Sequence, residues 1–405
     1  MKILSINKFY FQKRGAEQYM FSLEDLLEKN GHHVVPFAMK DPQNVRADSD
    51  RFFVSRVELE HPRIGWNAVK AAGRLFYSFE AERKLADLIR AYKPDIAHLH
   101  NIYHQLSPSV LVALRAAKIP IVQTLHDYAY LSPSYGLFDH GAVCERVKPR
   151  RYIAAVMHRC VKNSYFASAL DAAAYRYHAL AGLDERLVDR LIAPSEFVKK
   201  KFAEWGRGAG KITVVPHFID AAFYEPDLEP GPEIIYVGAL SEEKGIGTLV
   251  AAMERVPEAR LKVVGGGPLE KRLKEYVKAA ALKNVEFVGQ VKRHDALAMV
   301  AASRFVVIPS LSFETFGLAA IEAAALGKAV IASDIGALPE NVVAGETGLL
   351  VPPGDIVALA NAIRELGKNE PQIRRMGFVG RERALKLYNP ADHYRKIMEI
   401  YHSVL

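Results

Sequence analysis

Short apolar runs along the chain alternate with longer segments in which apolar residues recur every three or four positions. The short runs are rich in valine and isoleucine, which is typical of strands buried on both faces of a parallel sheet. The longer segments have the period of helices that bury one face. The runs that we interpret as strands are residues 2–6, 33–37, 94–100, 119–124, 191–194, 212–216, 233–237, 260–265, 285–288, 304–309 and 329–333. This alternation predicts an α/β fold built on parallel strands.

A stretch rich in proline and glycine divides this pattern in two. Residues 219–232 contain three prolines and one glycine, a composition that is typical of a linker. We therefore predict an N-terminal domain of residues 1–218 and a second domain of residues 233–390. A chain of 405 residues is long enough for two such domains. Pro390 should interrupt the final helical pattern.

The strand predicted at residues 304–309 leads into the strongest candidate for chemistry. Two serines and then Glu314 follow it, and a helix is expected over residues 317–326. In an open α/β sheet, ligands bind at the carboxyl ends of the strands, where Glu314 should lie. The backbone amides that open the helix are a natural seat for an anion. Glu322 lies inside this otherwise apolar helix and therefore needs a partner.

Glycines and a few polar residues follow other predicted strands. Gly15 and Ala16 come between the first strand and a helix, where glycine lets the backbone approach a ligand and a helix start favours phosphate. Lys244 lies in the turn after the seventh strand. His126 stands at the end of the fourth strand, beside Asp127, which can orient its ring.

The composition excludes several classes of protein. Half of the residues are hydrophobic and a quarter are charged, as in an ordinary globular chain. No apolar run approaches the length of about 18 residues that a membrane-spanning helix needs. The first residues are typical of a strand rather than of a signal peptide. Two cysteines argue against a secreted disulfide framework, so we expect a cytoplasmic protein.

The net charge of +8 is confined to the first half of the chain. Residues 1–200 contain 29 basic and 21 acidic residues, a balance of +8, whereas the remainder contains 25 of each. We infer an anionic partner, either a lipid-phosphate acceptor or a bilayer surface, and do not expect nucleic acid. The densest basic cluster, with Glu145 as the only acid beside it, is Arg146, Lys148, Arg150, Arg151, Arg159 and Lys162. Apolar residues lie between these bases, so the cluster is either a solvated face or a site of peripheral contact with an anionic membrane.

Glu314 and Glu322 together resemble the Glu-x7-Glu signature of retaining glycosyltransferase family 4. The resemblance covers essentially the whole chain, because four other pieces occur in the family's order. They are Gly15-Ala16-Glu17, His126-Asp127, Val237-Gly238 through Lys244-Gly245, and Gly265-Gly266-Gly267-Pro268. The resemblance implies the GT-B architecture, in which two Rossmann-like domains face each other across a cleft. It also implies that a final helix, within residues 391–405, crosses back to the first domain. The chain looks similar to the subgroup involved in bacterial surface polysaccharide assembly.

The resemblance implies an activity and a set of roles. The enzyme would move a sugar from a nucleotide-diphosphate sugar to a hydroxyl of a glycan or lipid-linked acceptor, with retention of anomeric configuration and without a metal or other cofactor. Glu322 would bind the donor ribose, and Glu314 and His126 the transferred sugar. Lys244 would bind the diphosphate, whose growing charge must be stabilised as it leaves. The remaining donor contacts would come from Gly15, Ala16, Gly238, Gly266, Gly289, Val291, Phe316, Gly317 and Leu318.

The chain departs from the family pattern at the diphosphate. The family usually has an arginine where this chain has Ala239, so Lys244 should carry more of the charge. The alternative is that Lys13 or Arg14 replaces the missing arginine. A second glycine is also usual where this chain has Ala16.

We do not expect a metal site. His98 and His100 face the same way on the third strand and a further histidine follows, but no cysteine or carboxylate nearby completes a set of ligands. Members of the subgroup often carry extra cysteines, whereas only Cys144 and Cys160 remain here, too few for a structural zinc site. Residues 48–50 resemble an acid-x-acid metal motif, but they lie in a polar stretch that we interpret as solvated surface.

Three other functions stay open on the sequence alone. A nucleotide-sugar epimerase has the same architecture. A nicotinamide-dependent oxidoreductase is less favoured, because residues 265–268 lack the full Gly-x-Gly-x-x-Gly spacing. An anion-binding scaffold without activity would not need Glu314, Glu322, Lys244 and His126 together.

Overall fold

The computed structural model describes residues 1–57 and 72–405. The described chain divides into two compact units. The first unit comprises Met1–Leu137, Glu145–Pro216 and Ala391–Leu405, and the second comprises Phe138–Cys144 and His217–Pro390. The sequence of residues 63–92 has the apolar spacing of helices, and the first part of this segment lies outside the described residues.

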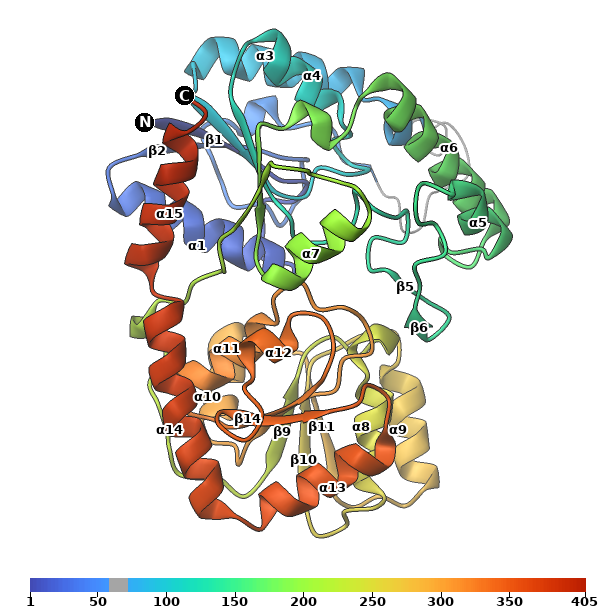
Figure 1. Ribbon diagram of the computed structural model, residues 1–405, viewed down its shortest axis with the longest axis vertical. Coiled ribbons are helices and arrows are strands. Elements are labelled where there is room, and N and C mark those ends of the chain that lie inside the picture. Colours follow the sequence, from blue (N-terminus) through green and yellow to red (C-terminus); the bar gives the residue numbers. More distant parts are fainter. Residues whose placement is uncertain (58–71) are drawn as a thin grey trace. The chain divides into compact units, whose positions relative to one another are not determined.

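The first unit is built on a parallel sheet with strands in the order β2-β1-β3-β4-β7-β8 (Figure 1). The strands are β1 (Lys2–Ile6), β2 (His33–Phe37), β3 (Ile96–Leu99), β4 (Ile121–Thr124), β7 (Arg190–Ala193) and β8 (Ile212–Val214). All residues of β3 and β4 are buried, as expected of strands covered on both faces. The helices are α1 (Gly15–Lys29), α3 (Phe79–Tyr92), α4 (Ser109–Ala116), α5 (Tyr152–Met157), α6 (Tyr165–Ala181), α7 (Glu196–Glu204) and α15 (Pro390–His402).

The second unit has a parallel sheet in the order β11-β10-β9-β12-β13-β14 (Figure 1). The strands are β9 (Ile234–Val237), β10 (Leu261–Val264), β11 (Val285–Gly289), β12 (Val306–Ile308), β13 (Val330–Ser333) and β14 (Gly348–Val351). The helices are α8 (Ile246–Met253), α9 (Glu270–Ala279), α10 (Arg293–Ala301), α11 (Leu318–Ala325), α12 (Leu338–Asn341), α13 (Ile356–Gly367) and α14 (Glu370–Leu387). A short hairpin of β5 (Phe138–Asp139) and β6 (Ala142–Val143) is also grouped with this unit.

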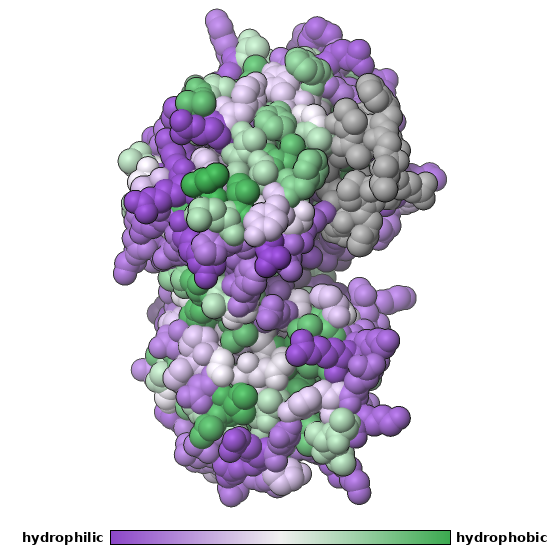
Figure 2. Space-filling model, turned by 90° about the vertical axis from the view of Figure 1, so that its right-hand side faces the viewer, coloured by the Kyte–Doolittle hydropathy of each residue, from purple (hydrophilic) through white to green (hydrophobic). Residues whose placement is uncertain are grey.

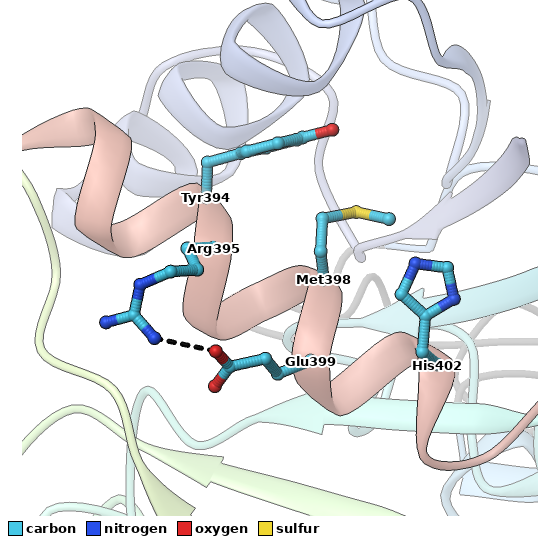
Figure 3. Close-up of a pocket in the computed structure, with 5 residues that line it drawn as sticks. All are labelled: Tyr394, Arg395, Met398, Glu399 and His402. Atoms are coloured by element: carbon cyan, nitrogen blue, oxygen red, sulfur yellow. Dashed lines mark hydrogen bonds and ion pairs between the residues drawn. The ribbon is translucent and has the colours of Figure 1, made fainter.

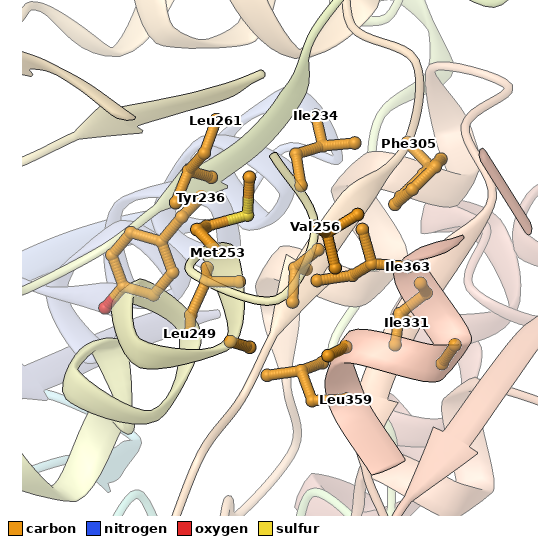
Figure 4. Close-up of a cluster of buried hydrophobic side chains, with 14 of the residues drawn as sticks. Ile234, Tyr236, Leu249, Met253, Val256, Leu261, Phe305, Ile331, Leu359 and Ile363 are labelled. Atoms are coloured by element: carbon orange, nitrogen blue, oxygen red, sulfur yellow. The ribbon is translucent and has the colours of Figure 1, made fainter. Parts of the chain in front are cut away.

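The second sheet is packed on both of its faces. Successive residues of a strand point to opposite sides, so Ile234 and Tyr236 of β9 enter one core while Ile235 enters another. The first core also contains Leu249 of α8 and Leu359 of α13 (Figure 4). The second core is closed by α11. Each fully buried apolar side chain contributes about 1.5–3 kcal/mol, so helices on both faces fix the positions of the strand ends.

In each sheet the strand order reverses beside a central strand. From β9 the chain continues outward to β10 and β11, then crosses to β12 on the other side of β9 and continues to β13 and β14. The turns that leave β9 and β12 therefore diverge, and ligands of open α/β sheets bind at such a switch point. In the first sheet, the chain continues from β1 outward to β2 and then crosses to β3 on the other side of β1, so the turns that leave β1 and β3 also diverge.

The last helix is held to the first unit by buried rings. As predicted, Pro390 interrupts the helical pattern and opens α15. Nε2 of His393 lies 3.0 Å from the hydroxyl of Tyr19, and the hydroxyl of Tyr401 lies 2.6 Å from Nδ1 of His98. All four rings are buried, so these polar contacts are made away from water.

Removing one hydroxyl tests this attachment. We expect Tyr401→Phe to lower the free energy of unfolding by about 1–3 kcal/mol, because a buried nitrogen of His98 loses its partner. The matched control is Tyr394→Phe, which removes a hydroxyl that lies 2.8 Å from the half-buried His32 and should cost less than about 1 kcal/mol. Urea unfolding of both variants measures the difference. Equal losses would mean that the buried contact does not anchor α15.

Candidate active site

Lys244 and Glu314 are brought together from two neighbouring strands. Lys244 ends a single turn of 3₁₀ helix after β9, and Glu314 lies in the loop after β12. The two residues form an ion pair, with 2.7 Å between Nζ of Lys244 and Oε1 of Glu314. The hydroxyl of Ser310 donates to the same oxygen at 2.7 Å. Both charged groups therefore lie at the switch point of the second sheet.

Backbone contacts fix the two loops against each other. The carbonyl of Glu243 accepts hydrogen bonds from the amides of Leu311 and Ser312, at 2.9 and 3.2 Å. Gly245 has a φ of +68°, and a Cβ there would lie 1.7 Å from the carbonyl oxygen of Pro309. Only glycine fits this position, so the turn that carries the lysine can pack directly on the end of β12.

The charge of Glu314 depends on Lys244. Burial by itself raises the pKa of the Glu314 carboxyl, but the charge of Lys244 and hydrogen bonds from Lys244 and Ser310 lower that pKa below the ordinary value of 4.5. Glu314 is therefore ionised at neutral pH. The side chain of Lys244 is 36% exposed, so this cation is accessible to a ligand.

Glu322 has the partner that its apolar helix requires. It lies on α11, and Arg293, the first residue of α10, donates to its Oε1. The hydroxyl of Tyr224 donates to the same oxygen at 3.1 Å, and Arg293 donates to that hydroxyl at 2.8 Å. Nε of Arg293 is buried and has no hydrogen-bond partner among the described residues. The sequence predicted the need for a partner but not these two residues.

The start of α11 follows the loop that carries Glu314. The helix begins at Leu318, one residue later than predicted, with Gly317 at its N-cap. Gly317 has a φ of +81°, a left-handed conformation that favours glycine over residues with a side chain. Phe316 is buried, and its carbonyl accepts a hydrogen bond from the side chain of Asn341. The loop is therefore fixed where the positive end of the helix dipole favours an anion.

Three predicted donor-binding glycines also lie at the carboxyl edge of the second sheet. Gly238 follows β9, Gly266 lies after β10 and Gly289 ends β11. Backbone hydrogen bonds of 2.8–3.0 Å join these turns to one another. Val291 follows them and packs, half-buried, against the core that α11 closes. The structure thus gathers these residues on the same edge as Lys244.

In the first unit, His126 lies in a row of stacked histidines. Its Nε2 is 2.9 Å from Nδ1 of His100, whose ring stacks on His98 with centroids 4.8 Å apart. Burial, and then the charge of Lys8, lower the pKa of the His126 imidazole to about 3. The ring is therefore neutral at neutral pH and acts through hydrogen bonds. We expected Asp127 to orient it; the carboxylate of Asp127 instead accepts a backbone amide two residues further on, at 2.9 Å.

Lys8 is a cation that we did not single out from the sequence. It follows β1, so it lies at the carboxyl edge of the first sheet. Burial lowers the pKa of its ammonium group, and the charges of Asp127 and Glu17 oppose this shift. Its position two residues after the end of the first strand is the signal that could have identified it.

Gly15 and Ala16 lie inside a helix rather than in a turn. They are the first two residues of α1, whereas we predicted that they precede the helix. The carboxylate of Glu17 accepts hydrogen bonds from the amide of Arg14 at 3.1 Å and from the side chain of Asn7 at 3.2 Å. The carboxylate of Glu17 thus fixes the residue that precedes α1, and phosphate binding at this helix start stays a prediction.

One of the histidines that we considered as a metal ligand, His98, has partners within the protein. Nδ1 of His98 lies 2.6 Å from the hydroxyl of Tyr401, and its Nε2 lies 2.8 Å from the hydroxyl of Thr124. Both ring nitrogens of His98 are thus engaged within the protein. Cys144 is buried and Cys160 is half-buried, and both are thiols.

Our interpretation of residues 48–50 as solvated surface was wrong for the central residue. The two acids are exposed, but Ser49 is buried and its hydroxyl donates to the carbonyl of Pro36 at 2.6 Å. The serine ties this segment to β2, which explains its burial in an otherwise polar stretch.

A cavity of about 570 Å³ opens on α15. Its lining, shown in Figure 3, is Tyr394, Arg395, Met398, Glu399 and His402. Two of these side chains pair with each other, because Arg395 donates to Glu399 at 2.6 Å. The lining comes from one helix and includes none of the predicted site residues, so this cavity is not a candidate active site.

Two protein-family models match the chain. The model of Glycosyltransferase Family 4 matches residues 13–223, and that of Glycosyl transferases group 1 matches residues 223–383. The first match spans more than half of the 405 residues. The chain belongs to glycosyltransferase family 4.

Relatives of this family 4 protein include enzymes that are named for different products. Over 304 residues it is 29% identical to a glycogen synthase of Mycobacterium tuberculosis, a match that covers 73% of this chain and 65% of the synthase. Over 402 residues it is 26% identical to a phosphatidyl-myo-inositol mannosyltransferase of Mycolicibacterium smegmatis, covering 96% of this chain and 90% of that enzyme. The match to the glycogen synthase thus spans slightly less than two thirds of that enzyme's length.

Solved structures share the fold of the family 4 protein. A sucrose-phosphate synthase from Thermosynechococcus elongatus has a TM-score of 0.72 and 24% identity, with 99% of this chain and 98% of that one covered. Anabaena HepE, solved in complex with UDP and glucose, has a TM-score of 0.70 and 20% identity over the full length of both chains. These likenesses confirm the predicted α/β fold of the GT-B type, with two Rossmann-like parallel sheets.

The pH dependence of stability tests the pairing of Lys244 with Glu314. In the wild type, the lowered pKa of Glu314 gives stability that is present above about pH 4.5 and is lost as the pH falls through the folded-state pKa. In Lys244→Met the cation is gone while burial remains, so the folded-state pKa should rise above the unfolded one and the variant should lose stability as the pH rises.

The difference in unfolding free energy between wild type and Lys244→Met should therefore grow between pH 4 and pH 7, by about 1–3 kcal/mol for a partly exposed pair. Urea unfolding at the two pH values measures it. The control is Lys244→Met combined with Glu314→Gln, which should remove most of the pH dependence. A difference that does not change with pH would contradict the assigned pairing.

Proposed function

We propose that this protein transfers a sugar from a nucleoside-diphosphate sugar to a hydroxyl group of an acceptor, with retention of the anomeric configuration. The observation that carries the proposal is the Lys244–Glu314 ion pair at the ends of β9 and β12, followed by the N-terminus of α11. A donor of this kind combines a diphosphate with a sugar that is rich in hydroxyls. A cation beside an ionised carboxylate and a helix start matches that combination.

The diphosphate would be bound by Lys244 and by the first amides of α11. Negative charge grows on the leaving phosphate in the transition state, and a fixed cation stabilises that state more than the ground state. Ala239 brings no charge to the turn; its carbonyl accepts the Tyr236 hydroxyl at 2.7 Å. We propose that Lys244 is the main protein cation on the diphosphate and that transfer does not need a metal.

Glu314 and Glu322 would bind different parts of the donor. Glu314 is ionised and can accept hydrogen bonds from hydroxyls of the transferred sugar. Glu322 is oriented by Arg293 and Tyr224 through one carboxylate oxygen, which suits it to the ribose hydroxyls. The buried Nε of Arg293, a donor with no partner among the described residues, supports a ligand acceptor beside this acid.

The first unit would contribute His126 and the acceptor side. A neutral imidazole can hydrogen-bond a sugar hydroxyl without adding charge. The relatives support an acceptor that is a glycan or a lipid-linked molecule, because one is named a glycogen synthase and another a phosphatidyl-myo-inositol mannosyltransferase. The complex of Anabaena HepE with UDP and glucose supports a nucleotide sugar as donor.

Nucleotide release from a panel of nucleotide sugars, with and without glycan and lipid-linked acceptors, tests the proposal. We expect release that depends on an acceptor, and a product whose anomeric configuration by NMR matches that of the donor.

Lys244→Ala should lower turnover by about a hundredfold or more, as loss of one oxyanion donor does. Lys271→Ala, at a lysine that is 89% exposed in the same unit, is the control and should transfer normally. Epimerisation of a donor without nucleotide release would identify an epimerase instead, and near-normal transfer by Lys244→Ala would overturn the site.

Separate measurements of nucleotide affinity and sugar preference distinguish the two acids. Glu322→Gln keeps the shape of the side chain but weakens hydrogen bonds that contribute roughly 1.5–3 kcal/mol, so affinity for the nucleoside diphosphate should fall about tenfold or more. Glu314→Gln should lower turnover and change the preferred sugar, while the affinity for the diphosphate alone is kept. Calorimetry with nucleoside diphosphates and competition between donor sugars measure these effects. Equal losses of affinity with unchanged sugar preference in both variants would show that the roles are wrongly assigned.

A further inference from the structure

The outward face of α6 is apolar although it is exposed to water. Its exposed residues recur at the helical spacing, beginning with Phe166, which is 78% exposed, and ending with Leu180, which is 72% exposed. Between them, Ala169, Ala173 and Tyr177 are also exposed. A surface helix normally directs polar residues outward, whereas α6 directs apolar residues outward.

The neighbouring helix α5 extends the same surface. Ile153 and Met157 lie one turn apart and are 68% and 67% exposed. The two helices pack on each other through Tyr152 of α5 and Tyr175 of α6. We define the α5–α6 face by its large exposed side chains: Ile153, Met157, Tyr165, Phe166, Tyr177 and Leu180. Figure 2 shows apolar residues gathered on this side of the first unit, and exposed apolar patches of this kind mark binding surfaces.

Basic residues accompany the α5–α6 face. The guanidinium of Arg159 lies 5.4 Å from the ring centroid of Tyr165, so charge and apolar surface are in direct contact. The exposed arginines on α6 and in the segments that flank α5 are Arg146, Arg150, Arg151, Arg159 and Arg176. All of these except Arg176 belong to the basic cluster that the sequence left open as either a solvated face or a membrane contact.

Nearby acids do little to offset this charge. Glu145 forms an ion pair with Lys201 at 3.1 Å and accepts a hydrogen bond from the indole of Trp205. Asp171, the acid of α6, is buried, and burial raises the pKa of its carboxyl to about 7 although Lys162 opposes the shift. The α5–α6 face therefore combines exposed apolar side chains with a net positive charge.

We propose that the α5–α6 face docks on the surface of an anionic membrane. The apolar side chains would enter the boundary between headgroups and acyl chains, and the arginines would contact lipid phosphates. Charge complementarity favours this occupant over a second copy of the chain, because a symmetric pairing would bring like charges together. The proposal deepens the proposed function, since it places the enzyme where a lipid-linked acceptor lies, but the docking itself needs no sugar transfer.

Sedimentation with lipid vesicles tests the docking directly. The intact protein should bind vesicles made of equal parts phosphatidylglycerol and phosphatidylcholine, and bind pure phosphatidylcholine vesicles far more weakly. Higher salt should weaken binding, because it screens the arginines. Equal recovery with both vesicle types would overturn the proposal.

Variants of the α5–α6 face show whether this surface makes the contact. Each base near an anionic surface contributes roughly a fivefold gain in binding, so Arg150→Gln, Arg151→Gln and Arg159→Gln together should lower vesicle binding on the order of a hundredfold. The matched control is Lys40→Gln, Arg46→Gln and Arg83→Gln, three exposed bases elsewhere in the first unit. It removes the same charge and should lower binding less than about fivefold. Equal losses in both triple variants would overturn the assignment to the α5–α6 face.

The apolar part is tested with a second pair of variants. Phe166→Ser with Leu180→Ser should lower binding to anionic vesicles by about tenfold or more, because two apolar side chains no longer enter the boundary. Phe378→Ser with Leu387→Ser, at two exposed positions of α14, is the control and should bind like the wild type. Self-association in the absence of lipid that Phe166→Ser abolishes would identify the face as an interface between copies and overturn the proposal. No donor or acceptor is present in these experiments, so they fail or succeed independently of the transfer reaction.

Discussion

A largely buried carboxylate that needs a cation beside it organises the carboxyl edge of the second sheet. Glu314 keeps its charge because Lys244 lies 2.7 Å away, and the lysine reaches it because glycine at position 245 lets one turn pack on the end of β12. The same lysine would bind the diphosphate of the donor. A ligand phosphate would then share with Glu314 a cation that is already in place. The stability of this edge and its proposed chemistry thus depend on a single contact.

The sequence predicts most strands because burial on both faces leaves continuous apolar runs. It fails for β14, in which Leu349 and Leu350 are only half-buried and the run is short. It fails for α10 as well, where Val300 alone is buried and no apolar face repeats. Both elements take their structure from neighbours that are distant in sequence. Local patterns predict an element only when its own burial is regular.

Candidate site residues could be named from the sequence, but their partners could not. Lys244 and Glu314 are 70 positions apart, and Arg293 and Glu322 are 29 apart, so strand order decides which of them meet. The sequence indicated that Glu322 needs a partner, because a lone charge in an apolar helix is costly. It could not indicate that this partner is Arg293, because Arg293 lies at the start of a helix that was not predicted. Gly15 and Ala16 were placed in a turn for a similar reason, since the cap by Glu17 begins with an arginine and lacks the usual serine or threonine signal.

Amide hydrogen exchange of the intact chain, with and without UDP, GDP or ADP, tests the central claim most directly. The claim is that the turns after β9 and β12 hold a nucleoside diphosphate. It predicts slower exchange in residues 238–246 and 315–320 when the right nucleotide is bound, and loss of that protection in Lys244→Ala. Binding that slows exchange only in other segments, and leaves these two turns unchanged, would contradict it.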